Sequence, residues 1–539
     1  HLSNVDMEVL TKENDTLLTE IIYSLENDIL NFDLNNSQFI NKNNSWSINL
    51  DSLANYDIKN KIFNINKLTL LSGNEKIDIA LNYNYNSFNS IKLFFDNVAI
   101  ENLPLNTYNF SGLLDGDFIY EKNSNNESRL YFKNLTLDKY LLGNLDLNIN
   151  HIHNQKEFKF KSFLKNNSKV QLNTFGSFLY DEIDPKLDLI AKFDNLSINS
   201  LNIFGKNNIN NIRGDITGSI EIKNLLNTPE YIGDIYFNNS GLYVPYTEVD
   251  YSFDNKSKVS LTNNQFVFSN ILFSDSKFNS RGELNGAISH RNFKNWLLDL
   301  NIDSERLLVL NTKDVDNPIY YGTAFVSGDI SIAGPGESLK FEANVSSEKG
   351  TIFNIPLNDT KNFTENISYI KFANKNTNSI PDNSRFNKIN GIELDFDLSL
   401  NRNAEIEILI DRSSGSTIKG YGDGNLIMEI NNKGKFNMFG DFTVDNGKYN
   451  FVYAGILKKE FELKKGGTLS WSGDPKKALI NLNTSYSKIE ANPSILLDSP
   501  INLRIPVNVN VNLYGELLNP IPEFELEFPN VDSSINNEL

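Results

Sequence analysis

Residues 501–513 have the sequence INLRIPVNVNVNL, in which apolar and polar side chains alternate almost throughout. Alternation with a period of two places successive side chains on opposite faces of a β-strand, so this stretch predicts a strand with one apolar face and one wet face. At about 3.3 Å per residue the strand would be roughly 40 Å long, well beyond the usual length. The predicted apolar face consists of Ile501, Leu503, Ile505, Val507, Val509, Val511 and Leu513.

The same alternation occurs at 392–400 and 523–528, and in shorter form at 145–149, 158–163 and 187–193. Strands recur about every ten residues with turn residues between them, which indicates an all-β chain with meandering antiparallel pairing. One short amphipathic helix is predicted at 17–29, where Leu and Ile keep a helical spacing. The two longer segments contribute the apolar sets Ile392, Leu394, Phe396, Leu398 and Leu400, and Phe524, Leu526 and Phe528.

The composition favours a folded, acidic protein and excludes several kinds of function. The 539 residues include 50 Lys and Arg against 68 Asp and Glu, a net charge of −18 that repels phosphate backbones, so we expect no nucleic-acid partner. The absence of cysteine excludes disulfides, thiolate metal sites and cysteine nucleophiles. No apolar run approaches the roughly 18 to 20 residues of a membrane helix. Because the chain begins with His1, we expect it to be a piece of a longer protein.

An internal repeat appears when the glycines are aligned. Gly218, Gly328 and Gly424 are each followed by an alternating segment, and these copies recur about every hundred residues. Each of these glycines is predicted to open a strand. Because such strands have one apolar face that they cannot bury alone, neighbouring repeats are expected to stack, or the sheet to curl around a continuous apolar interior.

The sequence offers no convincing catalytic or metal-binding constellation. His151 and His153 would share one strand face, but without cysteine or a third ligand they are interpreted as two exposed polar residues. The glycine-rich segment 420–424 is flanked by predicted strands, which favours a turn or bulge over a phosphate-binding loop. Carboxylates lie on the wet faces of strands, where solubility explains them. We therefore expect no enzyme activity, no metal and no cofactor.

A cluster of lysines lies beside an apolar pair near the C-terminal end. A solvated strand face is the favoured interpretation, and contact with an anionic membrane surface or a partner is the second. The cluster consists of Lys458, Lys459, Lys464 and Lys465, and it flanks Phe461 and Leu463.

The C-terminal half resembles the TamB-type translocation and assembly module family of the Gram-negative envelope, in its Bacteroidetes form. The resemblance covers about residues 300–530 and depends on the order of several motifs. These are LVLNT at 308–312, YYGTA at 320–324, GTIFNIPL at 350–357, GKYNF at 447–451, TLSWSGDP at 468–475, and LYGELLNP at 513–520 followed by Phe524-Glu525-Leu526.

The resemblance implies an elongated, taco-like antiparallel sheet with an apolar interior groove and a polar exterior. It predicts an N-terminal β-repeat region at 1–205, a middle β-repeat at 206–310 and a TamB-type β-groove domain at 311–539. It also implies a protein that crosses the periplasm from an inner-membrane anchor, an N-terminal segment absent from this chain, to an outer-membrane barrel of the TamA/BamA class.

The function implied by the resemblance is transport of phospholipid between the two membranes, together with support of outer-membrane protein assembly and secretion. Acyl chains would lie on the apolar face, and all fifteen alternating residues from Ile392 to Leu400, Ile501 to Leu513 and Phe524 to Phe528 would face the groove. Two alternatives remain: a scaffold that holds unfolded outer-membrane clients by β-augmentation, and a β-repeat adhesin with a dry core.

Overall fold

The structure is a computed structural model, and it describes most of the chain. The described residues are 2–10, 16–41, 44–85, 87–103, 109–180, 184–205, 208–224, 226, 229–262, 264–291, 294–317, 319–336, 338–357, 392–411, 415–431, 435–453, 457–492 and 504–529.

The chain divides into two compact units. The N-terminal unit contains residues 1–205, 211–240 and 255–266, and the C-terminal unit contains 206–210, 241–254 and 267–539. The three regions predicted from the sequence have different boundaries and stay a prediction.

The N-terminal unit is built from long strands joined by short turns. Its elements are β1 (Leu2–Leu10), β2 (Thr16–Glu26), β3 (Ile29–Asn41), β4 (Asn44–Leu50), β5 (Ala54–Asp57), β6 (Ile62–Ser72), β7 (Glu75–Asn84), β8 (Ser87–Ala99), β9 (Phe110–Glu121), β10 (Asn126–Leu137), β11 (Tyr140–Ile152), β12 (Glu157–Asn166), β13 (Lys169–Leu179), β14 (Lys186–Ser197), the four-residue helix α1 (Asn202–Gly205), β15 (Asn210–Lys223), the first part of β16 (Glu230–Val244) and β18 (Ser257–Thr262).

The C-terminal unit has the same construction. Its elements are β17 (Val249–Phe253), β19 (Gln265–Asp275), β20 (Arg281–Arg291), β21 (Lys294–Thr312), β22 (Tyr321–Pro335), β23 (Leu339–Ser347), β24 (Thr351–Pro356), β25 (Ile392–Leu400), β26 (Ala404–Asp411), β27 (Ser416–Asn431), β28 (Phe436–Tyr453), β29 (Leu457–Leu463), β30 (Thr468–Gly473), β31 (Leu479–Ala491), β32 (Ile505–Glu516) and β33 (Asn519–Glu527).

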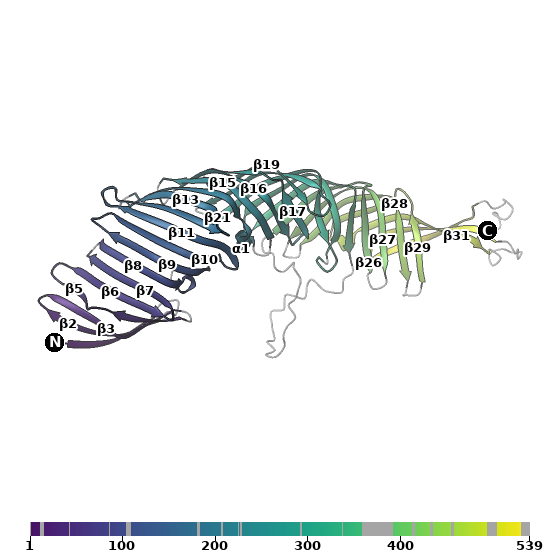
Figure 1. Cartoon of the computed structure of the whole chain (residues 1–539). Helices are drawn as coiled ribbons and strands as arrows, with labels where there is room; N and C mark the ends of the chain where they lie inside the picture. Colours follow the sequence, from purple (N-terminus) through teal and green to yellow (C-terminus); the bar gives the residue numbers. More distant parts are fainter. Residues whose placement is uncertain are drawn as a thin grey trace. The chain divides into compact units, whose positions relative to one another are not determined.

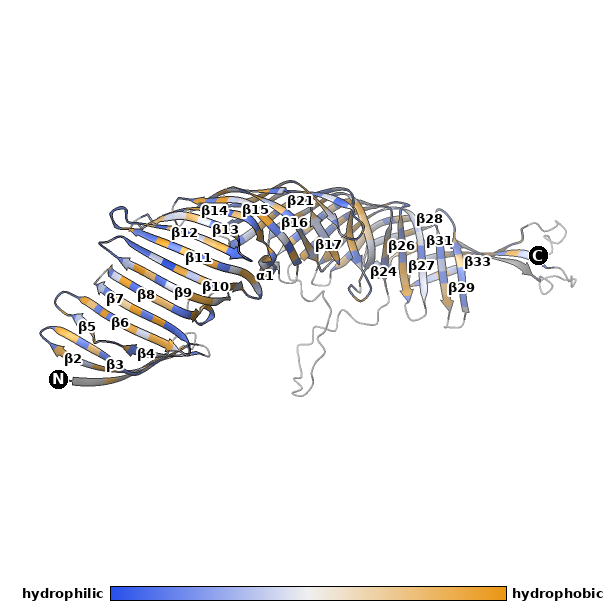
Figure 2. Ribbon diagram, viewed as in Figure 1, coloured by the Kyte–Doolittle hydropathy of each residue, from blue (hydrophilic) through white to orange (hydrophobic). Residues whose placement is uncertain are grey.

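Strand pairing within each unit is antiparallel along most of the chain. From β6 to β14 each strand pairs with the next one in sequence, and Figure 1 shows these strands side by side in chain order. Polar and apolar residues alternate along the strands, as the ribbon colours of Figure 2 show. The predicted all-β class and curled antiparallel sheet are confirmed.

Two pairs of strands in the C-terminal unit depart from the simple meander. Strand β23 lies parallel to β25, with Phe341 opposite Leu394, and β24 lies parallel to β26. Parallel neighbours require a crossover connection in place of a tight turn. The chain between β24 and β25 lies largely outside the described residues, and no local signal in the sequence predicted this change of direction.

The helix predicted at 17–29 is wrong, because this segment forms β2 and the start of β3. Ile21 lies opposite Leu34 and Tyr23 opposite Phe32, so cross-strand apolar contacts take the place of a helical stripe. The pairing shifts register between Leu18 and Glu20, and such an irregularity breaks strict alternation in the sequence. The broken alternation resembled a helical spacing, and pairing with neighbouring strands decided the structure.

Glycines allow close approach of neighbouring strands. Gly218 and Gly328, which were expected to open strands, lie inside β15 and β22, so that expectation is wrong. Both have positive φ values, 129° and 121°. A Cβ would come within 2.1 Å of the Asp234 carbonyl oxygen at Gly218 and within 2.4 Å of the Asn344 carbonyl oxygen at Gly328. Only glycine fits these positions without a shift of the backbone.

Asparagines in the left-handed region mark repeated β-bulges. Asn97 and Asn134 have φ values of 54° and 48° and lie where β8 and β10 shift register against their neighbours. The backbone N–H of Asn97 donates to Asp115 Oδ1 at 2.8 Å, and that of Asn134 donates to Asn144 Oδ1 at 2.8 Å. A bulge bends its strand and increases the local twist, so this recurring device helps the sheet to curl.

Candidate functional site

Each unit has an inner face, which we define as the sheet surface that carries the alternating apolar side chains. In the N-terminal unit, Leu81 of β7 lies opposite Ile65 of β6 and Ile91 of β8 on this face. In the C-terminal unit, Leu513 of β32 lies opposite Leu482 of β31. The outer face carries the intervening polar residues.

Those predicted groove residues that the structure describes lie in the C-terminal unit and differ in burial. Leu394, Leu400, Ile505, Val511 and Leu513 are buried. Ile392, Phe396, Leu398 and Val509 are half-buried and pack against the same apolar cluster. Val507 is half-buried. Ile501 and Leu503 lie outside the described residues.

The inner face of the C-terminal unit is filled. Its apolar cluster contains side chains from strands as distant in sequence as β21 and β32. The sheet therefore curls so that its inner face encloses these side chains. Met438, Ala478, Leu482 and Leu517 have 0% exposure. Beside these four residues the packing is close, and an acyl chain could enter there only by displacing side chains.

The last strand of the C-terminal unit is an exception. Phe524 lies opposite Val511, and Leu526 opposite Val509, so both residues of β33 continue the inner face. They are nevertheless 68% and 48% exposed, because β32 covers β33 on one side only among the described strands. Phe528, which follows β33, is half-buried.

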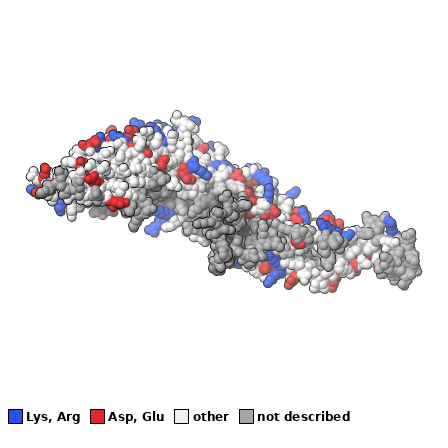
Figure 3. Space-filling view, turned by 90° about the horizontal axis from the view of Figure 1, so that it is seen from below, with Lys and Arg blue, Asp and Glu red and all other residues white. Residues whose placement is uncertain are grey.

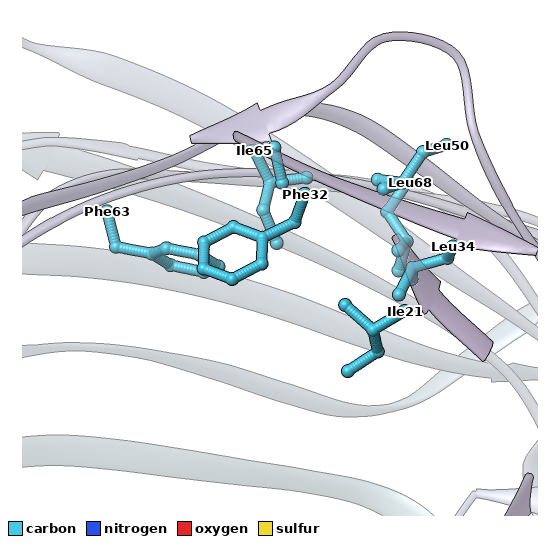
Figure 4. A pocket seen from close by; sticks show the side chains of 8 residues that line it. Ile21, Phe32, Leu34, Leu50, Phe63, Ile65 and Leu68 are labelled. Carbon is cyan, nitrogen blue, oxygen red and sulfur yellow. The ribbon is translucent and has the colours of Figure 1, made fainter. Parts of the chain in front are cut away.

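The inner face of the N-terminal unit is apolar but open. Most of its side chains are half-buried, including Leu81, Ile91 and Leu93. Between β2 and β6 the face forms an apolar cavity of about 250 Å³, toward which the side chains in Figure 4 converge. Its lining consists of Ile21, Phe32, Leu34, Leu50, Ala54, Phe63, Ile65 and Leu68.

The charged side chains of the N-terminal unit lie on the outer face or at the turns. On the outer face Lys133 pairs with Asp115 at 2.8 Å and Lys92 with Glu121 at 2.8 Å. In the C-terminal unit, Lys465 of the predicted lysine cluster pairs with Asp445 at 3.0 Å. Acidic and basic side chains are interspersed on the surface drawn in Figure 3. The N-terminal unit therefore has a charged, polar outer face and an uncharged inner face.

Neutral polar groups interrupt the apolar inner face of the N-terminal unit. Thr19 and Ser37 hydrogen-bond each other at 2.6 Å between their hydroxyls. His151 is 2% exposed, so its interpretation as an exposed residue is wrong. Its Nε2 lies 2.8 Å from Tyr180 Oη and its Nδ1 lies 3.1 Å from the Ser124 carbonyl oxygen. Burial lowers the pKa of His151 and raises the pKa of Tyr180 to about 12, so both are neutral near pH 7.

The described part of the chain contains no cluster of three His, Cys, Asp or Glu side chains that could hold a metal ion. His151 and His153 do not converge, because both ring nitrogens of His151 face other groups and His153 begins a short 3-10 turn. In the glycine-rich segment 420–424, β27 continues with a register shift between Tyr421 and Gly422, which is the expected bulge.

Sequence reasoning recognised strands of the N-terminal unit but did not select them as site residues. The alternation of Leu145, Leu147 and Ile149 was visible, and it places these residues on the open inner face. The longest alternating run, residues 501–513, belongs to the C-terminal unit instead. The length of a run indicates a long strand, but it carries no information about what covers the strand.

Within the described residues no helix has both the length and the apolarity to cross a membrane. A comparison with curated proteins gives no match. Residues 272–537 match the model of the TamB C-terminal domain. Proteins of this family belong to the cell envelope, where they have roles in lipid or protein transport and are associated with TamA-type partners; theirs is not a known enzyme family. The order of motifs and the curled all-β structure agree with this match, and the chain belongs to the TamB-type family.

Proposed function

We propose that the chain carries phospholipid acyl chains on the inner face of its sheet, as part of a path through the periplasm between the inner and outer membranes. The observation that supports this most directly is the open apolar inner face of the N-terminal unit. It joins strand to strand through pairs such as Leu81 with Ile91, and it bears only neutral side chains.

The energetics favour a sheltered path. A buried methylene contributes about 0.8 kcal/mol, so transferring a tail of about fourteen carbons into water costs about 10 kcal/mol. An apolar strip that replaces the membrane interior lowers this cost without any catalytic group. Half-buried side chains on the inner face are suited to the task, because they offer apolar surface that the protein itself has not filled.

The residues that the sequence predicted to face a groove have two different roles in this proposal, according to their burial. Those packed in the cluster of the C-terminal unit, such as Leu394 and Val511, hold the fold. Phe524 and Leu526 offer exposed apolar surface to an acyl chain or to a partner. Lipid is therefore expected mainly on the N-terminal unit.

A matched pair of substitutions tests the proposal. Leu81→Asp places a charge on the inner face, whereas Ala80→Asp places it on the outer face opposite Lys92. We expect Leu81→Asp to weaken binding of a fluorescent phospholipid at least tenfold, since loss of one leucine contact removes about 1.5 kcal/mol or more. Phospholipid recovered by organic extraction should fall in parallel, and Ala80→Asp should match the wild type in both measurements.

The proposal fails if the wild-type chain, shown to be folded by circular dichroism, binds no phospholipid. It also fails if the two variants bind phospholipid equally well.

The exposed last strand favours a second function, assembly of protein partners by strand addition. Among the described strands β33 pairs with β32 alone, and it exposes Ile521, Phe524 and Leu526. We propose that a TamA/BamA-class barrel or an unfolded outer-membrane client adds a strand here. A Phe524→Pro variant removes a backbone donor, so crosslinking of β33 to a purified barrel partner should be lost, while phospholipid binding should be retained.

A further inference from the structure

The two long edges of the N-terminal sheet differ. In an antiparallel meander alternate turns lie at opposite edges. One edge, which we call the packed edge, carries the β8–β9 connection with the 3-10 turn η1 (Ile100–Asn102). There Trp46, Val98 and Ile100 are 2%, 0% and 8% exposed and form an apolar cluster with Leu114.

The opposite edge, which we call the lysine edge, carries the turns β5–β6, β7–β8, β9–β10 and β11–β12. Backbone hydrogen bonds join neighbouring turns along it. Tyr85 donates its N–H to the Lys61 carbonyl oxygen at 3.2 Å, and Lys122 donates to that of Asn89 at 2.8 Å. The His153 N–H reaches Asn125 Oδ1 at 3.0 Å. The turns thus form a connected border to the inner face.

Aromatic rings line the inner face beside the lysine edge. Tyr83 and Phe88 make an edge-to-face contact with 5.1 Å between ring centroids. Further along, His151 lies 4.9 Å from both Tyr120 and Phe158, measured between centroids. Tyrosine is favoured where apolar and aqueous surroundings meet, because its ring is apolar and its hydroxyl is polar. The aromatic rows therefore mark the border between the apolar strip and water.

Exposed lysines lie at the turns of this edge, and two of them, Lys61 and Lys122, flank the β7–β8 turn. Lys61 Nζ lies 4.4 Å above the centroid of the Tyr85 ring, and Lys122 Nζ donates to Ser87 Oγ at 3.3 Å. Neither makes an ion pair within the described part of the chain, unlike Lys92, whose Nζ lies 2.8 Å from Glu121 Oε1. They bracket the β7–β8 turn from its two sides and are available to an anion.

The width of the strip fits one layer of acyl chains. From Ile77 at the packed edge to Tyr83 at the lysine edge, β7 spans about 20 Å at about 3.3 Å per residue. Half of the hydrocarbon core of a bilayer is about 15 Å thick. An acyl chain laid along β7 from the lysine edge would therefore cover about three quarters of the strip and fit within it.

We propose that glycerophospholipids lie across the N-terminal sheet in one orientation, with their phosphate groups at the lysine edge and their tails toward the packed edge. Lys61 and Lys122 bind phosphate, and the rings of Tyr83 and Tyr120 lie beside the glycerol region. This inference depends on the proposed lipid-binding function and adds to it the headgroup class and the residues that recognise it.

The test compares two fluorescent lipids with identical tails, a phosphatidylglycerol and a diacylglycerol that lacks phosphate. The variant Lys61→Gln/Lys122→Gln should bind phosphatidylglycerol about twenty-fivefold more weakly than the wild type, since each lysine near an anionic lipid contributes about fivefold. Its diacylglycerol binding should be unchanged. The phosphatidylglycerol difference should shrink at high salt.

Lys139→Gln is the matched control, because Lys139 lies at the packed edge with its Nζ 5.5 Å above the Tyr140 ring. It should bind both lipids as the wild type does. Millimolar inorganic phosphate should not displace phosphatidylglycerol, because the tails supply most of the binding energy.

If the wild type and the double glutamine variant bind phosphatidylglycerol equally well, the proposed orientation is wrong. If both also bind diacylglycerol, the proposed lipid-binding function is still supported. Displacement by millimolar phosphate would indicate a free-phosphate site and would also overturn the proposed orientation. If the folded wild type binds neither lipid, both the function and this inference fail.

Discussion

The N-terminal and C-terminal units carry the same alternation of apolar and polar residues, but they use it differently. In the C-terminal unit inner-face side chains such as Met438 and Leu482 have 0% exposure. In the N-terminal unit the inner-face side chains Phe63 and Leu81 are half-buried. Alternation therefore fixes which face is apolar, whereas the curl of the sheet and its coverage decide whether that face becomes a core or a binding surface.

The largest expected effect comes from a charge on each inner face. Leu482→Asp should destabilise the C-terminal unit by about 4 kcal/mol or more, because a carboxylate would be buried without a partner. Leu81→Asp should cost the N-terminal unit only about 1 to 2 kcal/mol, since its carboxylate can reach water. Urea unfolding is followed in variants that keep one tryptophan and carry phenylalanine at the other two positions: Trp471 fluorescence reports the first unit, and Trp46 fluorescence reports the second. Equal losses in the two units would remove the distinction between them.

Alkaline pH should act mainly on the C-terminal unit. Tyr246 and Tyr320 lie with their hydroxyl oxygens 2.8 Å apart in its interior, and burial raises the pKa of Tyr246 to about 12. An unfolded tyrosine ionises near pH 10, so the stability contributed by Tyr246 is complete below pH 10 and is lost as pH rises to about 12. Two pKa units correspond to about 2 to 3 kcal/mol.

The measurement is urea unfolding between pH 9 and pH 12, followed by Trp471 fluorescence. The Tyr246→Phe variant should lose the part of this pH dependence that Tyr246 contributes and keep the rest, because burial also raises the pKa of Tyr320 and of Tyr251. In the N-terminal unit burial also raises the pKa of Tyr180 to about 12, but this side chain is half-exposed and the loss should be smaller. A C-terminal unit whose stability is unchanged over this range would contradict a dry interior around Tyr246.

The smallest effects are expected on the outer faces, where the two units should behave alike. Ala80→Asp faces Lys92, and Ile427→Lys faces Asp397. Each new charge has an opposite charge across the strand pair, and Ile427 is already 50% exposed. Thermal unfolding should show changes within about 0.5 kcal/mol for both variants. A large loss from either would mean that its outer face is covered.

The fold class and the identity of the apolar face were predictable from the sequence, because a strand with Val509 and Val511 on one side must place Asn508 and Asn510 on the other. The family match followed from ordered motifs in the C-terminal half. The segment 17–29 was mispredicted because a register shift in β2 disturbs alternation and mimics a helical spacing. The parallel pairing of β23 with β25 had no local signal.

Openness of the inner face was not predictable, because it depends on contacts between residues far apart in sequence. Val511 is buried by a cluster that includes residues from β21 to β32, whereas the strands around Leu81 and Ile149 have no such cover. The alternating residues predicted to face a groove lie in the unit whose apolar cluster is the larger, and their contact with lipid stays a prediction. A local pattern of alternation predicts a strand, but it does not show which distant residues will pack on the apolar face of that strand.

The most direct test of the difference between the units is thiol labelling at matched inner-face positions, which the absence of native cysteine makes possible. Single variants Leu81→Cys and Leu482→Cys would be labelled with a maleimide, with and without phospholipid. We expect rapid labelling at Leu81→Cys that phospholipid slows, and labelling at Leu482→Cys only when the protein unfolds. Rapid labelling at Leu482→Cys that phospholipid slows, with no protection at Leu81→Cys, would contradict it.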